Sequence, residues 1–123
     1  MIHTDTQVLV WLFNRQSSRL SDAAKRIVAA QPLLASPMTI FELQMIRHKT
    51  GTPDPLTVLA RLRQLFRLTV APTSFEAVAR AALDVNWTRD PFDRLIVANA
   101  MADGAQLLTA DRRIRENFAG AVW

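Results

Sequence analysis

Length, composition and charge describe one basic domain without cysteine. The chain has 123 residues, of which 50% are hydrophobic, and a net charge of +4, so a single domain is expected over residues 1–123. The absence of cysteine and the presence of only two histidines exclude disulfides, a cysteine nucleophile, thiolate zinc sites and an all-histidine metal site. Neither a signal-like N-terminus nor an apolar run of about 18 residues is present, so a cytoplasmic location is expected.

Predicted strands and helices alternate along the chain. In order they are a strand at 1–5, helices at 6–14 and 23–30, a strand at 32–36, helices at 37–50 and 56–66, a strand at 68–71, a helix from the cap Ser74 to about 85, a helix at 92–102, a strand at 105–109, a helical turn at 111–117 and an edge strand at 119–123. Gly51 and Gly104 supply stops for two of the helices. This order indicates an α/β sandwich around a mostly parallel sheet of four to five strands.

Two aspartates stand at the carboxyl ends of predicted strands. Asp5 closes the first strand, Asp111 follows the strand at 105–109, and a helical segment begins after each of them. Ligand sites in parallel sheets open at this edge, so both carboxylates are candidate metal ligands. Each would equally serve as the N-cap of the following helix. Neither position by itself decides between the two roles.

A glutamate interrupts an apolar face of the helix at 37–50. Glu42 has Met38, Met45 and Ile46 as its neighbours at i−4, i+3 and i+4. This pattern predicts that the carboxylate faces the interior, where it must be neutralised by an arginine or bind a cation.

A second acid lies on an inward-facing helix near the end of the chain. Asp93 shares its helix face with Ile96 and Val97 and lies in the first turn, where the helix dipole favours negative charge. Asp90 precedes Pro91 and is therefore the expected N-cap. We interpret Asp93 as a ligand and Asp90 as a supporting residue beside it.

The four acids Asp5, Glu42, Asp93 and Asp111 are expected to meet above one edge of the sheet. Carboxylates crowded in this way repel one another unless a divalent cation is present. Oxygen ligands favour Mg²⁺ or Mn²⁺, with one or two ions. The resulting hypothesis is that a metal-activated water attacks a phosphodiester in line and leaves a 5′-phosphate and a 3′-hydroxyl.

Four segments of the chain occur in the order of a known family. They are 5–11 (DTQVLVW), 36–43 (SPMTIFEL), 89–98 (RDPFDRLIVA) and 107–111 (LLTAD). In these motifs the chain resembles PIN-domain ribonucleases, and more narrowly the VapC-type toxins of prokaryotic toxin–antitoxin pairs. The resemblance implies a three-layer α/β/α sandwich and Mg²⁺- or Mn²⁺-dependent endonucleolytic cleavage of RNA at the four acids. It also implies a homodimer, a cognate antitoxin, and Thr6 and Thr109 as hydroxyls that support the ligands.

Basic and aromatic residues flank the two later acids. Setting aside the four candidate ligands, 7 of the 11 acids remain against 15 Lys and Arg, and such a basic exterior suits a polyanionic substrate. Surface pairing with acids is the alternative role for the arginines, and core packing is the alternative for the tryptophan. The candidate RNA contacts are Arg89, Arg94, Arg112, Arg113 and Trp87.

Other functions are weighed against the nuclease. A phosphatase or phosphotransferase of another aspartate-based fold is disfavoured, because such enzymes usually carry a second aspartate two residues after the first and position 7 is Gln. A non-catalytic nucleic-acid-binding or scaffolding domain of the same fold stays open. The wide apolar face of the helix at 56–66 is compatible with core packing, a dimer interface or an antitoxin groove.

Overall fold

Five short strands and seven α-helices alternate along the chain in the computed structural model, which describes residues 1–123. In chain order the elements are β1 (Ile2–Thr4), α1 (Thr6–Phe13), the 3₁₀ turn η1 (Ser17–Arg19), α2 (Asp22–Ala30), β2 (Leu33–Ala35), α3 (Pro37–Thr50), α4 (Pro55–Phe66), β3 (Thr69–Val70), α5 (Phe75–Ala82), α6 (Pro91–Ala102), β4 (Leu107–Leu108), α7 (Arg112–Asn117) and β5 (Ala121–Val122). The predicted alternation of strands and helices is confirmed.

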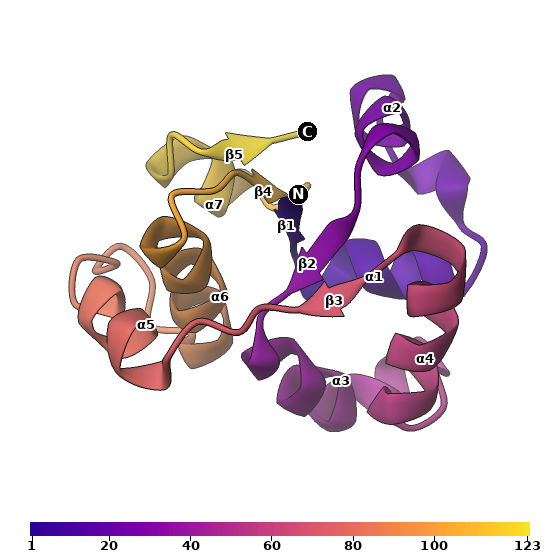
Figure 1. The fold of residues 1–123 in the computed structure, drawn as a ribbon, viewed down its shortest axis with the longest axis horizontal. Helices are drawn as coiled ribbons and strands as arrows, with labels where there is room; N and C mark the ends of the chain where they lie inside the picture. Colours follow the sequence, from indigo (N-terminus) through magenta and orange to yellow (C-terminus); the bar gives the residue numbers. More distant parts are fainter.

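The sheet has the order β3-β2-β1-β4-β5, and all four strand pairings are parallel. The chain first moves outward from β1 through β2 to β3 and then returns to the other side of β1 as β4 and β5 (Figure 1). The direction therefore reverses between β1 and β4. In an open parallel sheet, this reversal leaves a crevice at the carboxyl ends of the two central strands.

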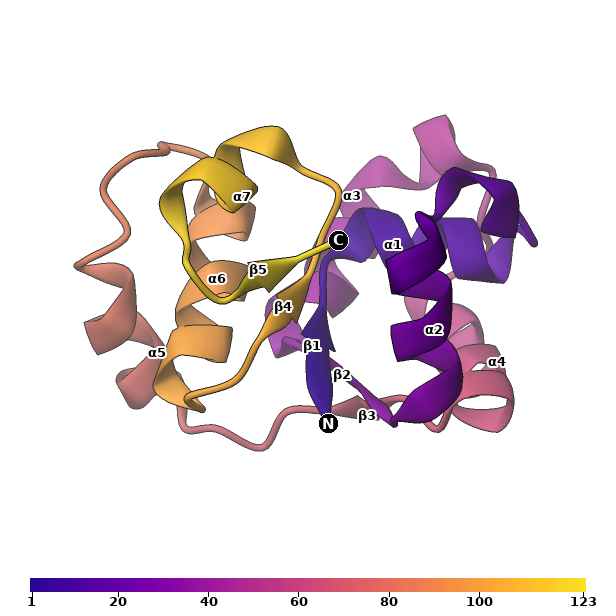
Figure 2. The same cartoon turned by 90° about the horizontal axis from the view of Figure 1, so that it is seen from above.

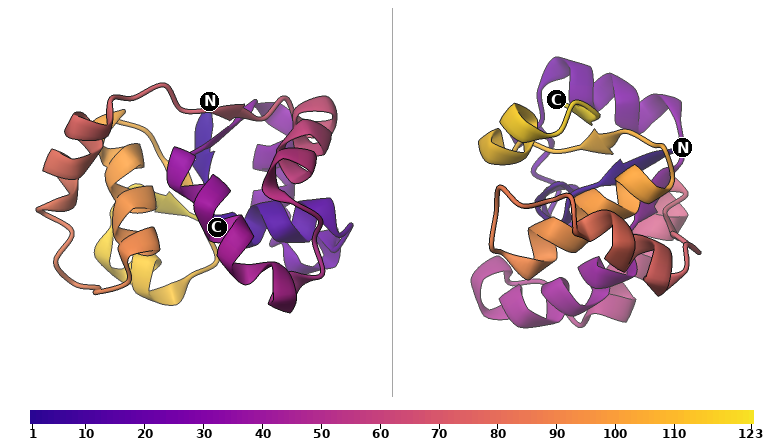
Figure 3. Two further views of the ribbon diagram at one scale, coloured as in Figure 1. Left: turned by 90° about the horizontal axis from the view of Figure 1, so that it is seen from below. Right: turned by 90° about the vertical axis from the view of Figure 1, so that its left-hand side faces the viewer.

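Helices cover both faces of the sheet and complete the expected three layers (Figure 2). The first core joins α1, α2 and α4 to one face, and the second joins α5, α6 and α7 to the other. Adjacent β4 residues show the division, because Leu107 belongs to the second core and Leu108 to the first. Helix α3 lies across the gap between the two groups of helices (Figure 3). None of the helices combines the length and the apolar character needed to span a membrane.

Several predicted boundaries are too wide. The helix capped by Ser74 ends at Ala82, because the next three N–H groups bond to carbonyls three residues back and the chain turns Val85 into the second core. The predicted strands also shorten, although parallel hydrogen bonds continue just beyond them. The Ala71 N–H donates to the Ala35 carbonyl at 2.9 Å, and the Thr109 N–H donates to Val122 at 3.1 Å.

Candidate active site

A cavity of about 290 Å³ opens at the carboxyl edge of the sheet, beside the reversal between β1 and β4. All four candidate ligands line it. Two come from the loops directly after β1 and β4, and the other two come from α3 and α6. The convergence follows from the topology, since parallel strands present their carboxyl ends together. Its lining residues are Asp5, Thr6, Gln7, Glu42, Ile46, Lys49, Thr50, Asp93 and Asp111.

Asp5 is the most buried of the acids, with 8% of its surface exposed. It stands at the N-cap position of α1, but its carboxylate makes no capping hydrogen bond there. Instead, the Thr109 hydroxyl donates to Asp5 Oδ2 at 2.7 Å. Burial raises the pKa of Asp5, and this hydrogen bond opposes the rise without cancelling it. Capping therefore does not account for Asp5, whereas a cation in the cavity would.

Thr109 links the two strand-end acids. Its hydroxyl donates to Asp5 and also accepts the Asp111 N–H at 3.0 Å. The side chain is completely buried, which fixes the hydroxyl between its two partners. Thr109 thus holds the loop after β4 against the end of β1.

Glu42 is half-buried and faces the cavity. Burial raises its pKa most, the Thr6 hydroxyl lowers it, and the charges of Asp5 and Asp90 raise it further. The predicted apolar stripe around it is wrong in one detail, because Met45 is 53% exposed. The inward direction of Glu42 thus comes from the position of α3 at the sheet edge rather than from a continuous apolar face.

Asp93 carries the clearest sign of crowding. Its pKa is raised to about 7, first by burial and then by the negative charges of Asp90, Asp5, Asp111 and Glu42. Asp90 Oδ1 accepts the backbone N–H groups of Phe92 and Asp93, so the predicted N-cap of α6 is confirmed. The capping acid and the cavity acid therefore repel each other across one turn.

Asp111 has two roles in the structure. Its Oδ1 accepts the Ile114 N–H at 3.0 Å and caps α7, which is the structural alternative considered for it. The same residue lines the cavity, and its charge raises the pKa of Asp93 and Asp5. Because Asp111 is exposed, its second carboxylate oxygen is free to turn toward a ligand.

The donor set fits a hard divalent cation. The cavity presents four carboxylates and hydroxyl or amide oxygens, which are the ligands that Mg²⁺ and Mn²⁺ prefer. As the side chains stand, no three acids are close enough together to hold one ion. Binding would therefore require side-chain rotations that draw the carboxylates inward. Burial, and after it the charges of the neighbouring acids, raises the pKa of Glu42 and Asp93, and a cation in the cavity would favour their charged forms.

None of the five candidate RNA contacts lines the cavity. Arg94 donates to the Ala82 carbonyl at 2.9 Å, which joins α6 to α5. Arg112 pairs with Glu116 on the surface of α7, and Trp87 packs against the second core. Arg89 and Arg113 are exposed. Arg112 and Trp87 thus make the contacts of their structural alternatives, whereas Arg94 bonds to a backbone carbonyl rather than to an acid. RNA contact stays a prediction for all five residues.

Sequence reasoning missed Lys49. Its position in the last turn of α3 explains it as a cation that favours the helix dipole, so no further role was expected. In the structure it is the only cationic residue that lines the cavity. Gln7 and Thr50 also contribute polar atoms there. The available signal was the spacing from Glu42, because seven residues are two helical turns and place both side chains on one face.

Comparison with known proteins gives concordant results. A family model described as the PIN domain matches residues 2–118. A protein described as Ribonuclease VapC22, from Mycobacterium tuberculosis (strain ATCC 25618 / H37Rv), is 34% identical over 116 residues, which cover 92% of this chain and 88% of that protein. The four candidate ligands all lie within the segment that the family model matches.

Two solved structures share the fold. A toxin–antitoxin complex from Klebsiella pneumoniae contains a chain that aligns with a TM-score of 0.68 at 20% identity, covering 100% of this chain and 97% of that one. VapBC2 from Rickettsia felis, bound to a DNA fragment from its promoter, aligns with a TM-score of 0.63 at 18% identity, covering 94% and 92%. The similarity extends over the whole sheet and its helices.

Proposed function

The chain belongs to the PIN-domain family, and from this membership we propose that it is an endoribonuclease that hydrolyses RNA phosphodiester bonds with Mg²⁺ or Mn²⁺. The single observation that carries the proposal is the convergence of Asp5, Glu42, Asp93 and Asp111 on one cavity. The 34% identity to a protein described as a ribonuclease supports RNA as the substrate.

The four acids would hold one or two ions at the sheet edge. When bound, the cation supplies a Lewis acid for the phosphate oxygens and lowers the pKa of a coordinated water. Asp5 is held in place by Thr109, and Glu42 lies within the influence of the Thr6 hydroxyl. The Thr109 hydroxyl orients the Asp5 carboxylate before substrate arrives, which limits the reorganisation that the reaction requires, whereas the Thr6 hydroxyl donates to Thr39 Oγ1. Attack by water leaves a 5′-phosphate and a 3′-hydroxyl.

Lys49 is proposed to contact a phosphate of the RNA beside the scissile bond. It is exposed and lines the cavity, so its ammonium group can reach the mouth while its stem remains on α3. A cation there also offsets the field of four carboxylates, which would otherwise repel a polyanion.

A toxin role within a type II toxin–antitoxin pair is proposed together with the nuclease activity. An apolar groove of about 580 Å³ lies between α1, α2 and α4, lined by Leu12, Leu20, Val28, Leu65 and Phe66 among others. An amphipathic antitoxin helix is a suitable occupant. The Phe41 and Phe75 side chains, 58% and 72% exposed, border a second groove, which suits the proposed homodimer. The proposed location is the cytoplasm.

The experiment that tests the nuclease is cleavage of total cellular RNA by purified protein in Mg²⁺, Mn²⁺ or EDTA. Asp93→Asn is the test variant, and Asp84→Asn makes the same chemical change at an exposed carboxylate outside the cavity. Discrete fragments that require metal, persist in Asp84→Asn and vanish in Asp93→Asn are expected. Ligation of a 5′-phosphate-specific adaptor to the fragments identifies their ends.

Two outcomes would contradict parts of the proposal. Fragments that end in a 2′,3′-cyclic phosphate would refute attack by water, because that product requires the RNA 2′-hydroxyl as nucleophile. Wild-type protein that cleaves no RNA but retains RNA binding would favour the alternative, a non-catalytic nucleic-acid-binding or scaffolding domain.

A further inference from the structure

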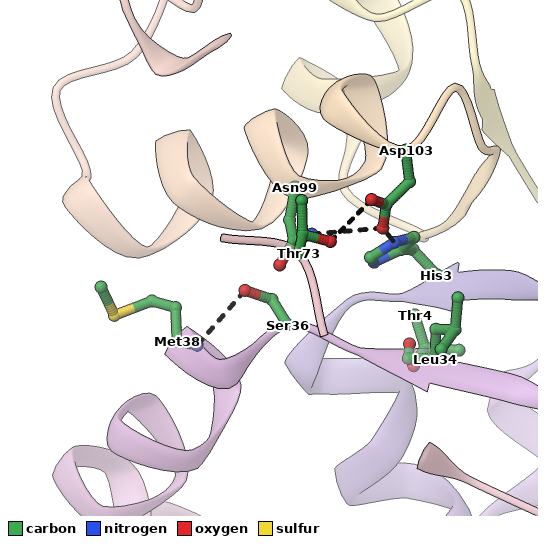
Figure 4. A network of polar contacts seen from close by, with 8 residues as sticks. All are labelled: His3, Thr4, Leu34, Ser36, Met38, Thr73, Asn99 and Asp103. Carbon is green, nitrogen blue, oxygen red and sulfur yellow. Dashed lines mark hydrogen bonds and ion pairs between the residues drawn. The ribbon is translucent and has the colours of Figure 1, made fainter. Parts of the chain in front are cut away.

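A polar network joins three segments of the chain (Figure 4). It lies toward the start of β1 and the end of α6, whereas the carboxylate cavity lies beyond the end of β1 and at the start of α6. His3 Nε2 of β1 lies 2.6 Å from Asp103 Oδ2, just beyond the end of α6. The Thr73 hydroxyl donates to Asp103 Oδ1 at 2.6 Å. Asn99 Nδ2 of α6 donates to Thr73 Oγ1 at 3.0 Å and to Asp103 Oδ2 at 3.3 Å. The network therefore ties the start of β1, the loop after β3 and the end of α6.

Burial of the network disfavours any other arrangement of its polar groups. His3 and Asn99 are completely buried, and each already has one side-chain atom without a hydrogen-bond partner, Nδ1 and Oδ1 respectively. Any displacement that also breaks their remaining contacts would leave fully desolvated polar groups. Asp103 occupies the C-cap of α6, where the helix dipole disfavours a carboxylate. Its contacts with His3 and Thr73 account for an acid at this unfavourable position.

His3 is the side chain through which β1 contacts the α6 side of the sheet. Side chains alternate along a strand. Ile2 packs in the first core, on the other face, and the Thr4 hydroxyl donates to the Leu34 carbonyl of β2. Apart from the hydrogen bond of Arg94 to the Ala82 carbonyl, the contacts of α6 with the second core are apolar and non-directional, so they constrain sliding less than hydrogen bonds do. The 2.6 Å hydrogen bonds of Asp103 with His3 and Thr73 would be broken by such sliding.

The same two elements carry two of the candidate ligands. Asp5 lies two residues after His3, directly beyond the end of β1. Asp93 precedes Asp103 by ten residues, which is about 15 Å along α6 at 1.5 Å per residue. A helix transmits a shift at one end to the other. A shift of α6 at the network would therefore change the separation of Asp93 from Asp5.

We propose that His3, Asp103, Thr73 and Asn99 act as positioning residues, which set the separation of Asp93 from Asp5 by fixing α6 against β1 at the far edge of the sheet. The proposal rests on the proposed metal-dependent cleavage of RNA. None of the four residues lines the cavity or is assigned a contact with substrate or metal. Their effect on catalysis is transmitted through the backbone of β1 and α6.

The test uses Asp103→Ala to break the network and Asp103→Asn to restore its two polar atoms at nearly the same places. Thr73→Val is a milder break in a half-buried loop residue. Leu62→Ala is the matched control, because Leu62 is buried in the first core and belongs neither to the network nor to the lining of the cavity or the proposed antitoxin groove. Three quantities are measured for each protein, namely the Mn²⁺ concentration that gives half-maximal thermal stabilisation, and kcat and KM on an RNA oligonucleotide below each protein's own Tm.

Asp103→Ala is expected to raise the Mn²⁺ midpoint about 10-fold and to lower kcat about 10- to 100-fold, with KM within about 3-fold of wild type. Asp103→Asn should recover most of both losses, and Thr73→Val should show a smaller shift in the same direction. Leu62→Ala should lower Tm without moving the Mn²⁺ midpoint.

Equal Mn²⁺ midpoints and kcat values for Asp103→Ala and Leu62→Ala would overturn the positioning role and leave a purely structural network. Thr73→Val, compared with wild type in the same way, decides the question if Asp103→Ala does not fold. A wild-type protein that neither responds to Mn²⁺ nor cleaves RNA would overturn the proposed function itself, and the positioning role with it.

Discussion

The acids at the two edges of the sheet have contrasting surroundings. At the carboxyl edge, four acids share a cavity with one lysine, and the pKa of Asp93 rises to about 7. At the amino edge, Asp103 has His3, Thr73 and Asn99 as partners. At both edges, residues on or directly beside β1 and α6 take part. Both carboxylate oxygens of Asp103 have partners, whereas burial and the charges of neighbouring acids raise the pKa of Glu42 and Asp93 at the other edge, which indicates a binding site there.

The largest expected effect that sharpens this comparison is the loss of cleavage in Glu42→Gln. The substitution keeps the shape of the side chain but removes a charge from the proposed metal site. We expect kcat/KM to fall at least about 10³-fold, because a cation in such a site contributes several kcal/mol of charge stabilisation. Glu76→Gln is the control, since Glu76 is exposed on α5 and pairs only with Arg80. Similar losses in both variants, measured with a fluorogenic RNA, would remove Glu42 from the site.

Divalent cations should stabilise the carboxyl edge. At a concentration of 100 times the Kd, Mn²⁺ is expected to add about 2.7 kcal/mol to the free energy of unfolding, because it binds the folded state alone. Differential scanning fluorimetry with and without Mn²⁺ measures the change, and KCl at equal ionic strength separates site binding from the effect of salt. Asp5→Asn should lose most of the response. An unchanged response in that variant would place the ion elsewhere.

Acids at the two edges should change stability in opposite directions when they are removed. Without metal, Asp103→Ala is expected to lower the free energy of unfolding by about 2 kcal/mol, because His3 is left buried without its partner. Asp93→Asn should raise it by about 1 kcal/mol, after allowance for its partial exposure, because the variant relieves repulsion. Urea unfolding in EDTA gives both values. A lower free energy of unfolding in both variants would contradict the expected difference between the two edges.

The pH dependence of stability should separate Asp93 from the other groups. Its pKa is 3.8 in the reference state and about 7 in the folded protein, so the folded state binds more protons between these values. The free energy of unfolding should therefore fall as pH rises from about 4 to 7 and remain low above that range. In Asp93→Asn the decline should be shallower, with Asp5 and Glu42 still contributing in the same direction. Urea titrations at a series of pH values in EDTA measure the slope, and parallel curves for the two proteins would refute the assignment.

Sequence patterns predicted the fold because each pattern has a local cause. Alternating strands and helices, Pro37 after Ser36 and Asp90 before Pro91 determine where helices begin, and the parallel sheet follows from the order of elements. Strand lengths were less predictable, because a two-residue ladder depends on its neighbours rather than on its own residues. The convergence of the four acids was predictable for the same topological reason.

The surrounding contacts could not be predicted in the same way. The pairing of His3 with Asp103 spans 100 residues, and no periodicity within either segment indicates it. Arg94 and Trp87 lie close to the acids in sequence, yet they contact Ala82 and the second core, because the packing of α5 on α6 determines their surroundings. Proximity along the chain thus identified the acids but not the residues that surround them.

Lys49→Gln is the smallest effect that we expect at the carboxyl edge. Lys49 is exposed, so one phosphate contact made by it is worth about 1 kcal/mol, or a rise of about 5-fold in KM for RNA with kcat within about 2-fold. The dependence of KM on salt should weaken in parallel, since fewer counterions are released on binding. Lys25→Gln on α2, outside the cavity, controls for the loss of one positive charge from the whole molecule. Equal KM values and equal salt slopes for these two variants would show that Lys49 contributes only general charge, and the cavity would then receive its substrate without a dedicated cation.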